Sequence, residues 1–294
     1  MPSEEPRLRL DTERQSYRYY RNAVERHWDP AAIDLSSDRE SITALSADSF
    51  DSVRGTIALF GAGEETVTEE LAPLSVVLED FTDQLYVTTQ LYDEAKHAEF
   101  FDRYWERVVV PEERRRGLDP TGLLEERWFP PAYLELLERT ETAMARLLTD
   151  DTPENRARAY CHYHLTIEGV LAQTGYYSVD QELRRNGTAA LPGLLEGFDH
   201  IRTDEGRHVG FGMWKLKRLL ADGVSPGVVE ETTAPLVDLT VATVRESVVD
   251  ETGYVGEKLA TYAERKGEER LGQLFDEERL PAVDELVRLE RSER

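Results

Sequence analysis

The sequence predicts an all-α protein built as an antiparallel bundle of long helices, with shorter helices around it. Three observations support this fold class. Long segments carry apolar residues at helical spacing, and almost none shows the strict alternation of a half-buried strand. Turn signals rich in proline, glycine and aspartate separate these segments at short intervals. Four of the predicted helices span about 25 residues or more, as in a four-helix bundle.

The first long helix is predicted at 44–79. Its apolar positions recur at steps of three, four or seven: Ile57, Phe60, Val67, Leu71, Leu74 and Leu78. Pro73 lies within this pattern and should kink the helix, because proline has no backbone N–H to donate.

The remaining helices follow in order. They are predicted at 84–109, 132–149, 154–183, 194–221, 226–248 and 254–272. The segment Asp151-Thr152-Pro153-Glu154 is a start signal for the helix at 154–183. No linker separates these helices, so we expect one domain over 1–294. Its bundle core should lie at about 44–221, with accessory C-terminal helices at about 226–290.

Composition excludes several classes of function. The chain has 59 acidic and 35 basic residues, a formal net charge of −24, which disfavours binding to nucleic acid and to anionic membrane surfaces. Only five of the basic residues are lysine, a bias that resembles proteins of salt-loving organisms. The single cysteine, Cys161, excludes intrachain disulfides and cysteine-based zinc sites. With no apolar leader and no membrane-length apolar run, the sequence predicts a soluble cytoplasmic protein.

Four glutamates lie on the apolar faces of four different long helices. Glu64 interrupts the stripe between Phe60 and Val67, whereas its neighbour Glu65 lies on a solvated face. The other three glutamates are Glu94, Glu168 and Glu205, and a histidine follows two of them by three residues, His97 and His208.

Two Glu-x-x-His pairs and two lone glutamates form the ligand set of a carboxylate-bridged dimetal site. Residues three apart on a helix project side by side, so each pair can hold one ion. Without cations, four buried carboxylates would be costly or protonated. Chance alone gives roughly one Glu-x-x-His in such a chain, so coincidental charge pairs are the alternative. The inward placement on different helices favours the metal site.

Two further residues have open roles. His164 lies one turn before Glu168, where it could be a ligand or could pack behind the ligands. Asp204 directly precedes Glu205 and could accept a hydrogen bond from either His97 or His208, or could be solvated.

The motifs resemble those of the ribonucleotide reductase small-subunit superfamily, which has a ferritin-like fold. They are Gly63-Glu64-Glu65-Thr66-Val67-Thr68, Asp93-Glu94-Ala95-Lys96-His97 and Asp204-Glu205-x-x-His208. Within this superfamily the chain most resembles the ligand-binding oxidases, over roughly residues 40–220. A glutamate as the first ligand, here Glu64, is typical of these oxidases.

The resemblance implies the site residues and their metals. Glu64, Glu94 and His97 would hold one ion, and Glu168, Glu205 and His208 the other. Manganese and iron, or two irons, are the implied cofactors. Other implied features are a long-chain fatty acid ligand beside the metals, reaction with molecular oxygen, and a homodimer.

The resemblance also implies a covalent modification, an ether bond between a valine and a tyrosine. The matching positions are Val67, three residues after Glu64, and Tyr163, five residues before Glu168. Ordinary core packing is the alternative for both. Five residues correspond to about 140° around an α-helix, so Tyr163 and Glu168 can share the site only if that helix is distorted or the tyrosine reaches across. Tyr176, two turns after Glu168, matches another tyrosine near the site.

Two other functions compete with the oxidase. A reductase radical subunit would be expected to carry a tyrosine where this chain has Phe101, and a tail tyrosine, whereas no tyrosine follows Tyr262. An iron-storage bundle would assemble into a cage and is usually a shorter chain.

Overall fold

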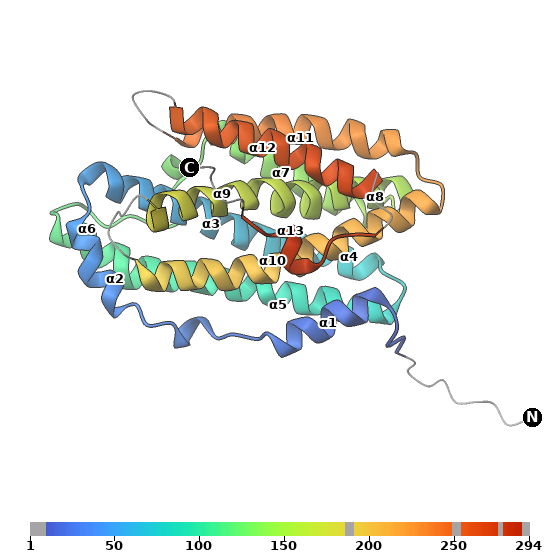
Figure 1. Cartoon of the computed structure of the whole chain (residues 1–294), viewed down its shortest axis with the longest axis horizontal. Coiled ribbons are helices and arrows are strands. Elements are labelled where there is room, and N and C mark those ends of the chain that lie inside the picture. The colour runs from blue at the N-terminus through green and yellow to red at the C-terminus, as the bar shows by residue number, and fades with distance from the viewer. Residues whose placement is uncertain (1–9, 186–190, 249–253, 276–278, 290–294) are drawn as a thin grey trace, which may run out of the picture.

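The computed structural model describes residues 10–185, 191–248, 254–275 and 279–289, apart from the side chains of Val67, Arg184, Arg185 and Tyr254. Within these ranges all regular secondary structure is helical, and the long helices run side by side along the long axis of the molecule (Figure 1). The all-α, ferritin-like fold class predicted from the sequence is therefore confirmed.

Four helical segments form the central bundle. They are α3 (Ala47–Glu70), α5 (Phe81–Tyr104), the continuous segment α8, η5 and α9 (Pro153–Tyr160, Cys161–Ala172 and Gln173–Val179), and α10 (Pro192–Ala221). Helix α3 packs against α5, α5 packs against α10, and α10 packs against both α8 and η5.

The first predicted helix is broken where the proline predicted a kink. Helix α3 ends at Glu70, and α4 (Ala72–Val77) begins after Leu71 with Pro73 in its first turn. Helix α5 starts at Phe81, three residues earlier than predicted, because the Asp80 side chain accepts hydrogen bonds from the backbone amides of Thr82 and Asp83. After Tyr104 the chain continues through the π-helical turn η3 (Trp105–Val109) into α6 (Val110–Arg115).

The segment predicted as one helix at 154–183 contains a long π-helical stretch. Twelve residues, Cys161–Ala172, form η5, and a second π-helical segment, η6 (Asp180–Arg185), follows α9. A π-helix pairs residues five apart, so residues i and i+5 lie close to one face rather than about 140° apart. This distortion places Tyr163 and Glu168 on the same side of the segment.

Flanking helices cover the bundle. Helices α7 (Pro131–Arg146), α11 (Pro226–Ser247) and α12 (Tyr254–Phe275) contact η5 from outside, and α13 (Val283–Leu286) lies on α10. On the opposite side, α1 (Gln15–Glu25) packs on α5 and α10, and α2 (Ser36–Ser41) packs on α10 near the other end of the bundle. Helix α1 was not predicted from the sequence, although it buries Tyr19 and Ala23 at helical spacing.

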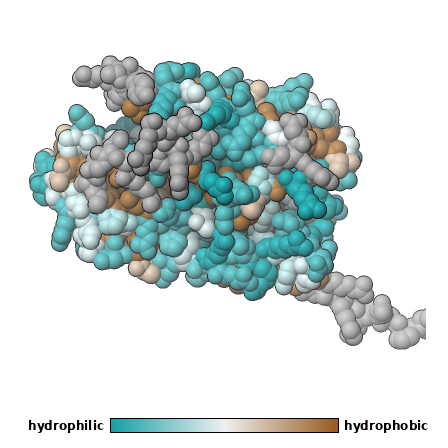
Figure 2. Space-filling model, in the orientation of Figure 1, coloured by the Kyte–Doolittle hydropathy of each residue, from teal (hydrophilic) through white to brown (hydrophobic). Residues whose placement is uncertain are grey.

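The visible surface is largely hydrophilic, with scattered apolar areas (Figure 2). Among the described residues, no helix is both long and apolar enough to cross a membrane.

Candidate metal centre

The structure brings all six predicted ligands together in the interior of the bundle. Helix α3 contributes Glu64, α5 contributes Glu94 and His97, η5 contributes Glu168, and α10 contributes Glu205 and His208. Each of the six is buried, with at most 6% of its surface exposed. Glu65, next to Glu64, is exposed, as its position off the apolar stripe predicted.

One half of the cluster surrounds His97. Its Nδ1 lies 3.3 Å from Glu64 Oε2, 3.3 Å from Glu94 Oε2 and 3.8 Å from Glu205 Oε1. Potential ligand atoms of these four residues all lie within 4.8 Å of one another.

The other half surrounds His208. Its Nδ1 lies 3.1 Å from Glu94 Oε1, 3.4 Å from Glu168 Oε1 and 3.5 Å from Glu205 Oε2. Glu94 and Glu205 thus turn one oxygen toward each histidine, whereas Glu64 approaches only His97 and Glu168 only His208. Two straddling and two terminal carboxylates are the arrangement that two adjacent ions require.

The electrostatics of the metal-free cluster are strongly perturbed. Burial raises the pKa of Glu64 to about 8, and burial together with the neighbouring Glu205 raises the pKa of Glu168 well above its usual value. Burial opposes charge on the histidines, but the surrounding carboxylates prevail and raise the pKa of both His97 and His208. Protons therefore provide the positive charge that this set of carboxylates needs when no metal is bound.

Unpaired polar atoms test whether the residues fit a pair of ions. Glu168 Oε2, Glu205 Oε2 and His208 Nδ1 are buried and make no hydrogen bond of good geometry with the described residues, although His208 Nδ1 lies within ion-pair distance of three carboxylates. Buried polar atoms are rarely left unpaired, because each costs about 1–3 kcal/mol. Carboxylate oxygen and imidazole nitrogen are donors that manganese and iron both accept. The donor set and its unpaired atoms fit a dimetal centre.

An aspartate from the opposite helix supports each histidine from behind. His97 Nε2 lies 3.1 Å from Asp204 Oδ2, which resolves the choice left open by the sequence, and His208 Nε2 lies 3.4 Å from Asp93 Oδ2. Trp28, in the loop after α1, donates from Nε1 to Asp204 at 2.8 Å and stacks on the His97 ring. These contacts fix the ring orientations and leave both Nδ1 atoms facing the carboxylates.

His164 does not join either ligand group. Its Nε2 lies 3.2 Å from Gln90 Oε1, while Gln90 Nε2 donates to Glu168 at 2.9 Å. Burial and the nearby His208 lower the pKa of His164 to about 3, so it is neutral and can orient the Gln90 amide toward the ligands. Of the two roles left open for His164, the structure supports packing behind the ligands.

The tyrosines predicted near the site lie close to it. The Tyr163 hydroxyl donates to Glu94 Oε1 at 3.0 Å. Tyr176 is buried against Phe60 and Phe198, and its hydroxyl has no hydrogen-bond partner among the described residues. Val67 lies in α3 one turn after Glu64, but its side chain is outside the described part of the structure.

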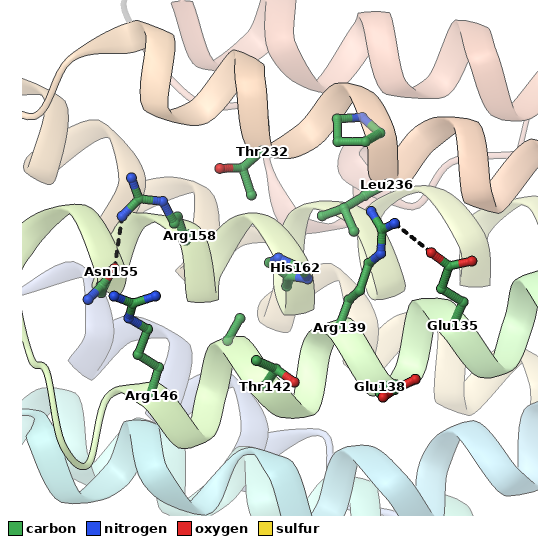
Figure 3. A pocket seen from close by; sticks show the side chains of 12 residues that line it. Glu135, Glu138, Arg139, Thr142, Arg146, Asn155, Arg158, His162, Thr232 and Leu236 are labelled. Carbon is green, nitrogen blue, oxygen red and sulfur yellow. Dashed lines mark hydrogen bonds and ion pairs between the residues drawn. The ribbon is translucent and has the colours of Figure 1, made fainter.

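A separate groove of about 540 Å³ lies on the outer side of η5, between α7, α8 and α11 (Figure 3). His162 faces it, one residue before the inward-facing Tyr163. Burial and Arg139 lower the pKa of His162 to about 4, so it is neutral at pH 7. No predicted metal ligand lines this groove, so it is distinct from the candidate centre.

Five residues around the ligands were not assigned a role from the sequence: Trp28, Gln90, Asp93, Lys96 and Arg207. Gln90 could have been found, since it lies one turn before Glu94 on the same helix face. Asp93 and Lys96 also carry a signal, because Asp-Glu-x-(Lys/Arg)-His occurs twice. Trp28 has no such signal, as it is distant in sequence from every ligand.

Comparisons with known proteins agree with this geometry. The family model described as ribonucleotide reductase, small chain, matches residues 12–274. A solved R2-like ligand-binding oxidase, a valine-to-leucine variant with an anaerobically reconstituted Mn/Fe cofactor, is 29% identical with a TM-score of 0.80. A valine-to-isoleucine variant of such an oxidase, also with Mn/Fe, is 30% identical with a TM-score of 0.80. Each alignment covers 89% of this chain and 94% of the other.

A third structure, a glycine-to-leucine variant of an R2-like ligand-binding oxidase, carries a non-activated Mn/Mn cofactor. It is 29% identical to this chain with a TM-score of 0.79, and the alignment covers 89% of this chain and 93% of the other. The solved relatives therefore carry manganese with or without iron, and this chain has the carboxylate–histidine site for such a dimetal centre. By the extent of the family match, the chain belongs to the ribonucleotide reductase small-chain family.

Proposed function

We propose that the chain is an oxygen-activating dimetal oxidase with manganese and iron, or two irons, as its cofactor. The observation that carries the proposal is the buried cluster of four carboxylates and two histidine Nδ1 atoms from four helices. In this assignment Glu64, Glu94 and His97 would hold one ion, and Glu168, Glu205 and His208 would hold the other, with Glu94 and Glu205 each turning one oxygen toward each histidine. The bound ions would supply the capacity to reduce molecular oxygen.

The protein's own part in the reaction centres on Tyr163. Burial and the nearby Glu94 raise the pKa of its hydroxyl well above the usual value, so it does not ionise near neutral pH. Its hydrogen bond to Glu94 Oε1 gives the phenolic proton an acceptor when the ring is oxidised. The surrounding buried side chains exclude water from this step.

We propose that this oxidation joins Val67 and Tyr163 by an ether bond. A valine C–H and the tyrosine O–H are lost, a C–O bond forms, and oxygen accepts the two electrons and two protons. Solved R2-like ligand-binding oxidases include variants at a glutamate and at a valine three residues later, and at two tyrosines thirteen residues apart. Glu64 with Val67, and Tyr163 with Tyr176, reproduce these intervals and so support the proposal.

Peptide mapping of the oxidised protein tests the cross-link. After metal loading under air, we expect the chain to lose the mass of two hydrogens and to give one branched peptide containing Val67 and Tyr163. Val67→Ala and Tyr163→Phe should each abolish that peptide while both metals stay bound, because neither side chain is a ligand. Separate linear peptides from fully oxidised wild-type protein would refute the cross-link and favour the reductase alternative.

We also propose that a long-chain fatty acid lies beside the metals with its carboxylate on the cluster. Phe60 and Phe198 pack on Tyr176, and Phe101 packs on both phenylalanines. Phe198 also lines a cavity of about 10 Å³, together with Val53, Val179, Leu183 and Leu194 among others, which a fatty acid would have to widen. The Tyr176 hydroxyl is available to a carboxylate. Denaturing extraction and lipid mass spectrometry of protein from its native host should give a stoichiometric amphiphile, and none would refute the ligand.

The reductase role has less support. At the position where a radical tyrosine would be expected, Phe101 is buried among the rings of Phe60, Phe100 and Phe198, with no hydroxyl to oxidise. Mixing the chain with a large reductase subunit and a ribonucleotide should give no turnover.

We further propose a homodimer in the cytoplasm. Gel filtration separates a dimer from the cage that an iron-storage role would require.

A further inference from the structure

The two metal-facing helices carry the same five-residue pattern, Asp-Glu-x-(Lys/Arg)-His. On α5 it runs from Asp93 to His97 with Lys96 in fourth place, and on α10 it runs from Asp204 to His208 with Arg207 in fourth place. The glutamates and histidines are the proposed ligands. The aspartates and the two cations are left over, although all four are almost completely buried.

The leftover residues form one closed network across the two helices. Lys96 Nζ donates to Asp93 of its own helix at 2.7 Å and to Asp204 of the other helix at 2.8 Å. Arg207 Nη2 donates to Asp204 of its own helix at 2.6 Å and to Asp93 of the other helix at 2.9 Å. Two buried carboxylates are thus balanced by two buried cations, and each cation contacts both carboxylates.

Each aspartate of the network contacts the histidine of the other helix. Asp204 of α10 meets His97 of α5, and Asp93 of α5 meets His208 of α10. Each aspartate is therefore held in place by the cation of the helix that carries its histidine. With Nε2 on an aspartate, each ring turns its Nδ1 atom toward the carboxylates of the candidate centre.

We infer that Lys96 and Arg207 are positioning residues for the metal centre: by holding Asp93 and Asp204 across the α5–α10 interface, they set the direction in which His97 and His208 present Nδ1. The inference rests on the ligand set in the proposed function. Trp28 lies on one side of this network: it donates to Asp204, stacks on the His97 ring and has Lys96 Nζ 4.8 Å from its ring centroid.

The test is the metal affinity of full-length variants. Loss of such supporting partners typically weakens metal binding 10- to 100-fold, so we expect Lys96→Met and Arg207→Met each to raise the Mn²⁺ dissociation constant by about that factor. Each should also change the visible spectrum of the Co²⁺-loaded protein, which reports ligand geometry. Arg207→Lys keeps the charge and should retain most of the wild-type affinity.

A matched control removes a half-buried lysine that also pairs with a buried aspartate. Lys215 Nζ donates to the buried Asp83 at 2.8 Å, and neither residue contacts the six ligands. Lys215→Met should leave the Mn²⁺ affinity within about twofold of wild type, although it also leaves a buried carboxylate with one partner fewer.

A charge-balanced variant separates positioning from simple neutralisation, and it remains usable if the single variants do not fold. Asp93→Asn with Lys96→Met removes one charge of each sign and leaves the Asp204–Arg207 pair intact. We expect near-normal thermal stability with Mn²⁺ affinity still reduced at least tenfold. Wild-type affinity in this variant, unchanged affinity in both single variants, or an equal loss in Lys215→Met would each overturn the inference. Wild-type protein that binds no metal would instead overturn the proposed function.

Discussion

At the scale of single residues, burial and mutual repulsion decide the chemistry of the cluster. Glu64 and Glu168 resist ionisation, whereas the pKa of Glu94 falls well below its usual value: burial opposes this shift, but Glu94 lies between His97 and His208. The metal-free protein thus holds protons at several ligands. A metal ion must displace them, so metal binding and pH are linked.

The stability of the metal-free chain should fall as pH rises. Because the pKa of Glu64 rises from 4.5 to about 8 on folding, its protonated form favours the folded state, and that contribution is lost as pH rises through 8. The raised pKa values of His97 and His208 act in the same direction. Between pH 6 and 8 we expect the free energy of unfolding to fall by about 1.4 kcal/mol per pH unit for each such proton.

Calorimetry at pH 6 and pH 8, with and without Mn²⁺, measures this effect. The metal-loaded protein should lose less stability over the same range, since its ligands carry no protons, and Glu64→Gln should reduce the slope of the metal-free protein. A metal-free chain that becomes more stable as pH rises would contradict the prediction.

At the scale of elements, the π-helical segment η5 determines which residues reach the site. It presents Tyr163 and Glu168 to the cluster and His162 to the outer groove. Arg270 of α12 is completely buried and donates to the backbone carbonyl of Gly169, next to Glu168, and to that of Leu286 in α13. This guanidinium therefore ties η5 to the C-terminal helices.

We predict that Arg270→Met destabilises the protein. Two buried carbonyls would lose their donor, at a cost of about 1–3 kcal/mol each. Urea unfolding measures the change in the free energy of unfolding. The visible spectrum of the Co²⁺-loaded protein should also shift, because Arg270 no longer holds the backbone next to Glu168. Arg265→Met, on the exposed face of the same helix and over the Tyr262 ring, should cost no more than about 1 kcal/mol. Equal effects of the two variants would show that Arg270 has no special role.

At the scale of the whole molecule, the net charge of −24 is the dominant property. Like charges at this density repel and destabilise the compact state, and salt screens the repulsion over distances beyond about 3 Å at 1 M. The face of the molecule in Figure 2 is largely hydrophilic.

We therefore expect the melting temperature to rise when KCl is increased from 0.1 M to 1 M at pH 7.5. The increase should be much smaller near pH 5, because the net charge is small close to the isoelectric point of about 4.7. Thermal melts across this grid of salt and pH provide the measurement. A chain that loses stability in salt at pH 7.5 would contradict both the screening argument and the salt-adapted interpretation of its composition.

Local sequence patterns alone were enough to predict where the long helices lie and which residues are candidate ligands. Apolar periodicity is a local property, so it located the long helices, and it exposed Glu64, Glu94, Glu168 and Glu205 as charges on faces that should be apolar. The break near Pro73 followed from the same local chemistry. Helix α1 was missed, although its pattern is also local.

The contacts of the candidate ligands, in contrast, depend on how the helices pack in three dimensions. The packing of α5 on α10 determines which carboxylates lie between the two histidines, and that Asp204 contacts His97 rather than His208. The paired residues of these two helices lie more than a hundred positions apart. The π-helical η5 has no distinct sequence signal, because its hydrogen bonds differ from those of an α-helix by a single residue. That shift nevertheless brings Tyr163 to Glu94. The spacing of residues within a helix determines which side chains share a face. The packing between helices determines which residues of the other helices those side chains contact.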